Sequence, residues 1–306
     1  MKLKIAVGRY PNTEALLDVR VGVEGADLEF VKYDSILTMS RSMVRNLDLD
    51  VVEMPLTTYI VARQFGKPIT ALPVFVVRVL PQFLMFANRE IIQGPLDLRG
   101  KRVGVRAYTV TTGVWGRGVL ARDYGLDADD VTWVAADDEH VLEYQRPANV
   151  GPALGALGDL LTSGDIAAVV GVDLDLSKLD ERMDLLIDDP ARAARSWLDA
   201  GRPYPLNHTV AVRSELLERH PGLASALFAA FEEARRVGAD TGPALGQGSV
   251  SPRQAELRFA QSVIGRYPLT YGLEANQDSV AALIGMLSDQ HIAPGGIDVG
   301  SIFAVV

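Results

Sequence analysis

The sequence predicts an α/β fold built as two lobes. Short, β-branched apolar runs alternate with helical patterns over the first two thirds of the chain, which indicates βα units and mostly parallel sheets. Segments rich in proline and glycine at 93–95 and 201–205 flank the middle of the chain. Two segments, 45–53 and 161–170, share one plan of helix end, polar turn and strand. These observations favour two lobes of similar design over one large sheet.

The individual elements follow from the spacing of apolar residues. Short apolar runs predict strands at 3–7, 28–31, 51–54, 69–72, 84–87, 103–105, 131–134, 166–170, 185–187 and 209–212. Helical spacing predicts helices at 35–47, 57–65, 112–124, 153–162, 214–219, 223–236, 252–264 and 275–290. Strands therefore stop near residue 214, and helices dominate the rest of the chain.

The expected lobes are discontinuous in sequence. Residues 1–88 and 208–306 form lobe 1, and residues 89–207 form lobe 2. The chain is expected to cross between the lobes near 80–92 and 203–210, with the C-terminal helices returning to lobe 1. A ligand is expected in the cleft between the lobes, because small molecules commonly bind where domains meet.

Composition limits the partners and the chemistry. The 306 residues carry a net charge of −9, with acidic residues spread along the chain, which argues against nucleic acid and against an anionic membrane as partners. There is no cysteine, so thiol catalysis, thiolate metal sites and disulfides are excluded. A small-molecule partner remains, and the oligomeric state is not predicted.

The N-terminal residues bear on the cellular compartment. Only four uncharged residues separate Lys4 from Arg9, which is too short for the apolar core of a signal peptide. No run approaches the ~18 apolar residues of a membrane span. The sequence therefore predicts a cytoplasmic protein, or a periplasmic one if a signal peptide has been removed.

A polar turn between the strand at 103–105 and the helix from 112 predicts an anion site. The turn holds Arg106 and Tyr108, and the helix pattern begins at Thr111 and Thr112. Strand, polar turn and helix is an arrangement that aims backbone N–H groups at an anion. The expected ligand carries a carboxylate. The alternative interpretation is an ordinary turn with a threonine cap.

Other candidate residues lie near the ends of predicted strands, where α/β sheets bind ligands. His208 and Asn207 stand at the start of the strand at 209–212, and a histidine in a cleft is a good general acid or base near neutral pH. The alternative for His208 is a hydrogen-bonded histidine at a capped strand. The remaining candidates are Arg9, Tyr10, Glu53, Thr58 and Asp173.

Neither a cofactor nor a metal is predicted. The sequence lacks the glycine-rich nucleotide motifs and the nucleophile elbow, and its four histidines have no metal-like spacing. The acidic run 137–140 is interpreted as a solvated loop rather than a metal site.

Several segments, in order along the chain, resemble hallmark blocks of the 4,5-dihydroxyphthalate decarboxylase family. The resemblance implies a periplasmic-binding-protein-like fold of the second structural type, with two crossovers. One departure is at 80–84, where the family often has a basic residue, a histidine and a serine; here only Arg78 lies upstream. The blocks are 50–59, 102–124, 205–210, 230–234 and 271–276, and matching positions include Glu53, Tyr108, Thr111, Trp115, His208, Tyr271, Glu274 and Asn276.

The resemblance implies a cofactor-independent decarboxylase, a lyase acting on a hydroxylated aromatic mono- or dicarboxylic acid. In this reading His208 is the acid, Glu53 or Tyr108 orients the phenol, and Arg9, Arg106 and the helix start at 111–112 bind carboxylates. The alternative is a solute-binding protein, a transporter component or a cytoplasmic sensor, that holds a small carboxylate or aromatic anion without chemistry.

Overall fold

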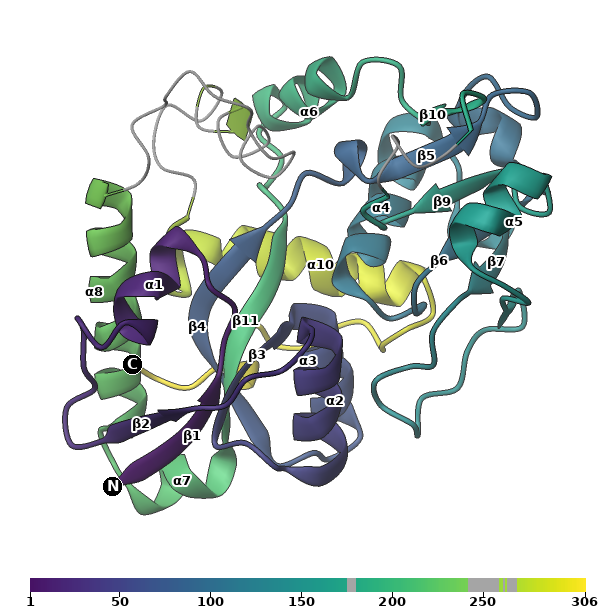
Figure 1. Cartoon of the computed structure of the whole chain (residues 1–306). Coiled ribbons are helices and arrows are strands. Elements are labelled where there is room, and N and C mark those ends of the chain that lie inside the picture. Colours follow the sequence, from purple (N-terminus) through teal and green to yellow (C-terminus); the bar gives the residue numbers. More distant parts are fainter. Residues whose placement is uncertain (175–179, 242–258, 261, 263–268) are drawn as a thin grey trace. The chain divides into compact units, whose positions relative to one another are not determined.

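The protein divides into two compact units, each built around its own β-sheet (Figure 1). The computed structural model describes residues 1–174, 180–241, 259–260, 262 and 269–306. Unit 1 comprises Met1–Arg78, Leu206–Val280 and Ile297–Val306. Unit 2 comprises Val79–Pro205 and Ala281–Gly296.

The sheet of unit 1 brings several strand ends to one edge. Its order is β2-β1-β3-β11-β4. Strand β1 pairs in parallel with β2 and β3, whereas β11 runs antiparallel to both β3 and β4. The C-terminal ends of β1, β3 and β4 therefore share an edge with the start of β11. The strands are β1 (Lys2–Ala6), β2 (Asp27–Phe30), β3 (Val51–Pro55), β4 (Ile69–Arg78) and β11 (Leu206–Arg213).

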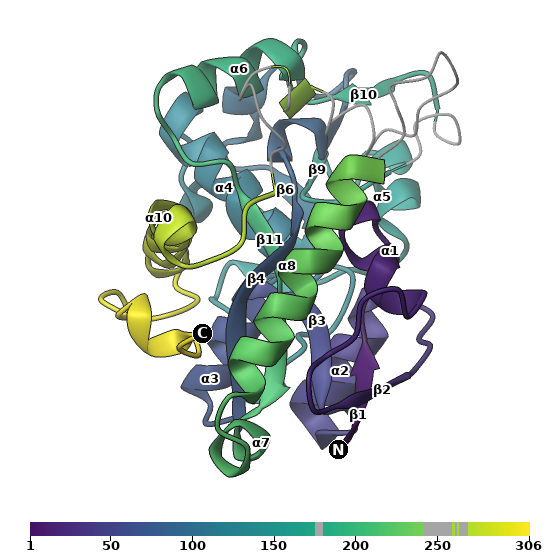
Figure 2. The same ribbon diagram turned by 90° about the vertical axis from the view of Figure 1, so that its left-hand side faces the viewer.

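Helices cover this sheet, and the long helix α8 packs against α1 and β4 (Figure 2). A side chain at Gly238 of α8 would collide with the backbone of Pro11, so glycine permits this close approach. Phe303 closes the core, with its ring centroid 5.7 Å from that of Phe75 and 6.3 Å from that of Tyr59. The helices are α1 (Pro11–Leu17), α2 (Ile36–Asn46), α3 (Leu56–Gln64), α7 (Ser214–Arg219) and α8 (Leu223–Thr241).

The sheet of unit 2 has the order β10-β5-β9-β6-β7-β8. Strands β9, β6, β7 and β8 are parallel, β5 is antiparallel to β9, and β10 is antiparallel to β5. The strands are β5 (Met85–Asn88), β6 (Arg102–Val105), β7 (Thr132–Ala135), β8 (Val150–Pro152), β9 (Ala168–Val170) and β10 (Met183–Leu185). The helices are α4 (Thr111–Tyr124), α5 (Leu157–Ser163), α6 (Pro190–Asp199) and most of α10 (Gln277–Asp289).

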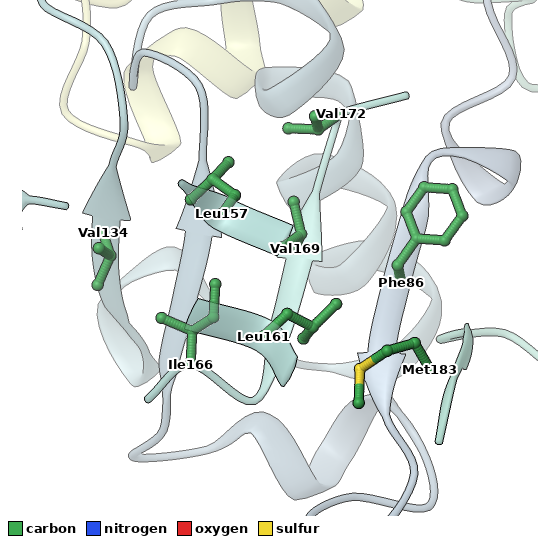
Figure 3. Close-up of a cluster of buried hydrophobic side chains, with 8 residues drawn as sticks. All are labelled: Phe86, Val134, Leu157, Leu161, Ile166, Val169, Val172 and Met183. Atoms are coloured by element: carbon green, nitrogen blue, oxygen red, sulfur yellow. The ribbon is translucent and has the colours of Figure 1, made fainter. Parts of the chain in front are cut away.

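One face of this sheet is covered by α5, whose Leu157 and Leu161 pack onto the strands in a buried apolar cluster (Figure 3). A Cβ atom at Gly104 of β6 would lie 2.8 Å from the side chains of both Leu157 and Ile166. The absence of a side chain there lets α5 approach the sheet closely.

The predicted α/β class is confirmed, but both sheets are mixed rather than mostly parallel. The difference arises because one strand in each sheet is reversed: β11 runs antiparallel to β3 and β4, and β5 runs antiparallel to β9 and β10. The sequence did not predict α1, α6 and β8. Strand β4 is longer than the predicted strand at 69–72, because it continues through Pro73 to Arg78. The helix predicted at 252–264 falls mostly outside the described residues.

The division into units differs from the expected lobes at three places. Unit 2 begins at Val79 rather than at 89, ends at Pro205 rather than at 207, and also holds Ala281–Gly296, which was expected in lobe 1. Packing explains the last difference, because Met286 lies against Gly118 of α4, where any side chain would collide with it. Among the residues that the structure describes, no helix combines the length and apolar character needed to span a membrane.

Candidate functional site

Three side chains meet at the shared edge of the unit 1 sheet, where strand ends gather. Glu53 of β3 is fully buried, and its Oε1 lies 2.6 Å from Nδ1 of His208 on β11. The Tyr10 hydroxyl donates to the same oxygen at 2.9 Å, and the Gly8 N–H donates to Oε2 at 2.6 Å. These four residues are called the Glu53–His208 cluster below.

The sheet register explains why Glu53 and His208 meet. Val210 pairs with Glu53, and His208 pairs with Pro55, so both side chains lie on one face of the sheet as diagonal neighbours. The distance between them along the chain, 155 residues, is bridged by the antiparallel return of β11.

Local chain geometry brings Tyr10 to the same carboxylate. The Tyr10 N–H donates to Oγ1 of Thr13, which donates in turn to the Gly8 carbonyl, and this pair of bonds fixes the turn before α1. A Cβ atom at Gly8 would lie 2.5 Å from the Tyr10 ring. Glycine is therefore needed for Tyr10 to fold back toward Glu53.

The cluster leaves one nitrogen of His208 for a ligand. A carboxylate only accepts hydrogen bonds, so Nδ1 carries the hydrogen in this contact. Within the described part of the chain, Nε2 makes no hydrogen bond, and the side chain is 13% exposed. An imidazole fixed in this way can hold or move a proton at Nε2.

Asn207 and Arg78 flank His208 in the sheet. Val77 and Arg78 of β4 pair with His208 and Leu206, so the register shifts at Asn207 and β11 bulges there. Asn207 is 7% exposed, and its Oδ1 has no hydrogen-bond partner within the described residues. Such bulges commonly re-aim a side chain next to a functional site.

Two other predicted residues of unit 1 lie outside the cluster. Arg9 is exposed and pairs with Asp18 at 2.9 Å and Glu14 at 3.1 Å. The hydrogen bonds to Asp18 and then Glu14 raise the pKa of Arg9. Thr58 is buried within α3.

In unit 2 the predicted anion-binding turn already holds one of the protein's own carboxylates. The N–H groups of Tyr108 and Thr109 donate to Glu139 at 2.9 and 3.0 Å, and the Thr109 hydroxyl donates at 2.6 Å. Arg146 adds a hydrogen bond of 2.7 Å. The interpretation of residues 137–140 as a solvated loop is wrong for Glu139 and for His140, because both are buried.

The other residues predicted around this turn differ in exposure and in hydrogen-bond partner. Arg106 is exposed, and its Nε lies 3.4 Å from Asp137. Thr111 is buried at the first position of α4, and the Thr112 hydroxyl donates to the Gly171 carbonyl at 2.6 Å. Asp173 is exposed after β9.

Sequence reasoning missed Glu139 and the buried Arg117. The guanidinium carbon of Arg117 lies 4.0 Å from the centroid of the Tyr108 ring, and its Nη2 donates to the Tyr108 carbonyl at 2.6 Å. Burial lowers the pKa of Arg117 and raises that of Tyr108. Glu139 could have been found from the sequence, because the loops that follow the parallel neighbours β6 and β7 meet at one edge of the sheet. No sequence feature indicated Arg117, since an arginine in a predicted helix is usually interpreted as a surface residue.

Unit 2 also has a surface pocket of about 510 Å³ beside α6. Its lining includes Arg202, which pairs with Asp123 and stacks 4.7 Å from the centroid of the Trp197 ring. No residue predicted as part of the site lines this pocket.

Comparison with solved structures identifies the fold. The Escherichia coli periplasmic aliphatic sulphonate binding protein SsuA gives a TM-score of 0.59 at 14% identity, covering 99% of this chain and 92% of that protein. The alkanesulfonate-binding protein SsuA of Xanthomonas axonopodis bound to MOPS gives 0.58 at 13% identity, covering 99% and 98%. A Candida albicans protein with the generic periplasmic binding protein fold gives 0.54 at 14% identity, covering 99% and 96%. The predicted periplasmic-binding-protein-like fold is confirmed.

Comparison with characterised sequences identifies the family, although no model of a known protein family matches the chain. A 4,5-dihydroxyphthalate decarboxylase of Comamonas testosteroni is 31% identical over 293 residues, covering 90% of this chain and 88% of that protein. A 4,5-dihydroxyphthalate decarboxylase of Pseudomonas putida is 33% identical over 213 residues, covering 65% and 82%. The chain therefore belongs to the 4,5-dihydroxyphthalate decarboxylase family.

Proposed function

We propose that the protein decarboxylates a hydroxylated aromatic carboxylic acid without a cofactor, with 4,5-dihydroxyphthalate as the first substrate to test. Family membership supports the reaction class. The observation that carries the proposal is the geometry of His208, whose Nδ1 is anchored on buried Glu53 while Nε2 is available to a ligand.

The proposed chemistry uses the ring of the substrate to hold charge. A hydroxyl para or ortho to the carboxylate supplies electron density to the ring carbon that bears it. Protonated His208 gives its Nε2 proton to that carbon, and the hydroxyl stabilises the resulting cationic ring. The bond to the carboxylate then breaks, its electron pair restores the aromatic ring, and CO₂ leaves. One proton is consumed, and solvent returns it to His208.

Glu53 acts in this proposal as a positioning residue rather than as a partner of the phenol. Its two oxygens accept from His208, Tyr10 and Gly8, and these contacts hold the imidazole in one tautomer and orientation. A carboxylate behind the ring also stabilises the imidazolium that donates the proton. Asn207, whose Oδ1 has no partner within the described residues, is proposed to accept from a ring hydroxyl.

The test replaces His208 and a matched exposed histidine. His208→Ala is expected to lower kcat by about 10²–10⁴-fold, the usual contribution of general acid catalysis, with the fold retained. His220→Ala is the control, because His220 is exposed at the end of α7, and its kcat should equal that of wild type. Release of CO₂ from 4,5-dihydroxyphthalate and related hydroxylated acids measures both. Unchanged turnover in His208→Ala would refute the assignment.

A second candidate function is binding of an aromatic or small carboxylate without chemistry. The fold shared with sulfonate-binding proteins favours it. In that case wild type binds hydroxylated aromatic acids in calorimetry, releases no CO₂ from any of them, and His208→Ala changes only affinity.

A further inference from the structure

We infer that Thr13 is a positioning residue for the proton transfer assigned to His208. Its hydroxyl links Gly8 and Tyr10, the two residues that donate to the carboxylate of Glu53 from the loop before α1, and that carboxylate anchors the imidazole. The inference rests on the proposed function, because it names the residue that keeps the proton donor aligned.

The carboxylate of Glu53 is held on both of its oxygens. The Tyr10 hydroxyl donates to Oε1 at 2.9 Å, and the Gly8 N–H donates to Oε2 at 2.6 Å. The last torsion of a glutamate side chain is soft, so a donor on one oxygen alone would leave the carboxylate free to turn. Donors on both oxygens fix its plane, and this plane sets the direction in which Oε1 faces Nδ1 of His208.

The Thr13 hydroxyl sets the spacing between these two donors. It accepts from the Tyr10 N–H at 2.9 Å and donates to the Gly8 carbonyl at 2.6 Å, so it spans the loop from one donor residue to the other. The Thr13 N–H donates to the Tyr10 carbonyl at 3.0 Å and closes the turn on the backbone side. Thr13 is fully buried, and a β-branched side chain is restricted in χ1, so the hydroxyl is held in both contacts.

The start of α1 gives Thr13 a fixed base. The neighbouring Asn12 donates through Nδ2 to the Val76 carbonyl at 3.1 Å and to the Tyr271 hydroxyl at 2.8 Å. Val76 lies in β4, and β4 pairs with β11, the strand that carries His208. The helix that holds Thr13 and the strand that holds the imidazole are therefore both fastened to β4.

The experiment compares Thr13→Val with Thr13→Ser. Valine has nearly the shape of threonine but neither accepts from Tyr10 nor donates to Gly8, whereas serine keeps the hydroxyl. Thr13→Val should lower kcat for decarboxylation by about 5- to 20-fold and change KM by less than about threefold, because the loop loosens behind the proton donor. Thr13→Ser should recover most of this loss.

A second readout follows the His208 ring without turnover. In ¹⁵N NMR spectra at about pH 9, where histidine is ordinarily neutral, the wild-type ring should be a single tautomer with its hydrogen on Nδ1. Comparison with His208→Ala assigns these signals among the four histidines. In Thr13→Val the signals should move toward those of the tautomer mixture that a free imidazole shows.

The matched control is Thr70→Val, at the other end of β4. The Thr70 hydroxyl lies 2.8 Å from that of Ser214, so its loss should lower Tm without changing kcat or the His208 signals. Equal changes in Thr70→Val and Thr13→Val would overturn the inference, because they would reflect a general loosening of unit 1.

The outcomes separate the positioning role from the proposed function. Wild-type His208 signals in folded Thr13→Val overturn the inference, and His208→Ala alone then tests the decarboxylase. Altered signals with an unchanged kcat overturn it as well, because alignment of the ring would not matter to the proton transfer. Altered signals in a protein whose wild type releases no CO₂ support the positioning of the ring and refute the decarboxylase. If Thr13→Val does not fold, Thr13→Ala decides by the same spectra, because it removes the hydroxyl without adding an apolar group in its place.

Discussion

At the scale of single residues, the chemistry of the unit 1 edge depends on what surrounds one carboxylate. Glu53 has no exposure to water, and burying an unpaired carboxylate would cost several kcal/mol. Three donors offset that cost, and one of them is the imidazole ring. The hydrogen bonds that offset the cost of burying the Glu53 carboxylate therefore also fix the orientation of the His208 ring.

This arrangement predicts different effects for Glu53 and Tyr10. Glu53→Gln keeps the size of the side chain but removes the charge behind the imidazolium, so kcat should fall by about 10²-fold or more. Tyr10→Phe removes one of the three donors and should lower kcat by less than about tenfold. Steady-state decarboxylation measures both variants, and equal kcat values for wild type and Glu53→Gln would contradict the positioning role.

The sequence pointed to Glu53 and His208 because Glu53 lies near the end of the predicted strand 51–54 and His208 directly precedes the predicted strand 209–212, and the structure brings these two side chains into contact. Sequence reasoning could not select the contact with Tyr10, which requires the side chain to fold back over Gly8. It also proposed Arg106 and Tyr108 as neighbours of an anion, whereas Glu139 occupies the N–H groups of that turn. The spacing of residues along the sequence does not indicate where a side chain points or which other side chain of the protein it contacts.

At the scale of elements, short segments depend on local caps more than on apolar spacing. The turn η2 (Pro95–Leu98) begins where Asp97 accepts from the N–H groups of Gln93 at 2.8 Å and Gly94 at 3.0 Å. The missed helix α6 also begins with a carboxylate that accepts a backbone N–H, but here the carboxylate is at the N-cap: Asp189 accepts from the Arg192 N–H at 2.8 Å, directly before Pro190. The sequence shows both features that favour a helix start here, the capping residue Asp189 and the proline at position 190. The strand β8 had no comparable signal, because it is three residues long.

The cap at Asp97 predicts a dependence of stability on pH. The hydrogen bonds from Gln93 and then Gly94 lower the pKa of Asp97 below its ordinary value of 3.8. Its contribution to stability is therefore fully present above about pH 4 and is lost as pH falls through the lower, folded-state value. The Tm of Asp97→Asn should lie below that of wild type at pH 6, and the gap should narrow below about pH 4.

Calorimetric scans from pH 6 down to pH 3 measure this gap. The control is Asp27→Asn, because the side chain of Asp27 makes no hydrogen bond within the described residues, and its Tm should follow that of wild type throughout. A gap for Asp97→Asn that stays constant down to pH 3 would show that the cap does not titrate with folding.

At the scale of the whole molecule, the chain builds two cores from interleaved segments. The C-terminal residues close the core of unit 1 against β4: the Ala304 N–H donates to the Ala71 carbonyl at 2.8 Å, and Phe303 packs on Phe75. The chain changes unit between Pro205 and Leu206, within the crossover expected at 203–210, and between Arg78 and Val79, just before the one expected at 80–92. The assignment of Ala281–Gly296 to unit 2 could not be predicted from the sequence, since it depends on the fit of Met286 against Gly118.

Separate cores predict separate responses to core mutations. Phe303→Ala removes a buried ring from unit 1 and should cost about 3 kcal/mol of local stability, whereas Leu161→Ala makes a comparable cavity in unit 2. In hydrogen exchange, Phe303→Ala should lower the protection of β3 and β4 amides more than that of β6 and β9, and Leu161→Ala should do the reverse. Because His208 and Glu53 stand on strands of unit 1, Phe303→Ala should also reduce decarboxylation more than Leu161→Ala does. If both variants lose hydrogen-exchange protection equally in both sheets, the two cores unfold as one cooperative body. The site would then depend on the stability of the entire chain rather than on that of the unit 1 sheet.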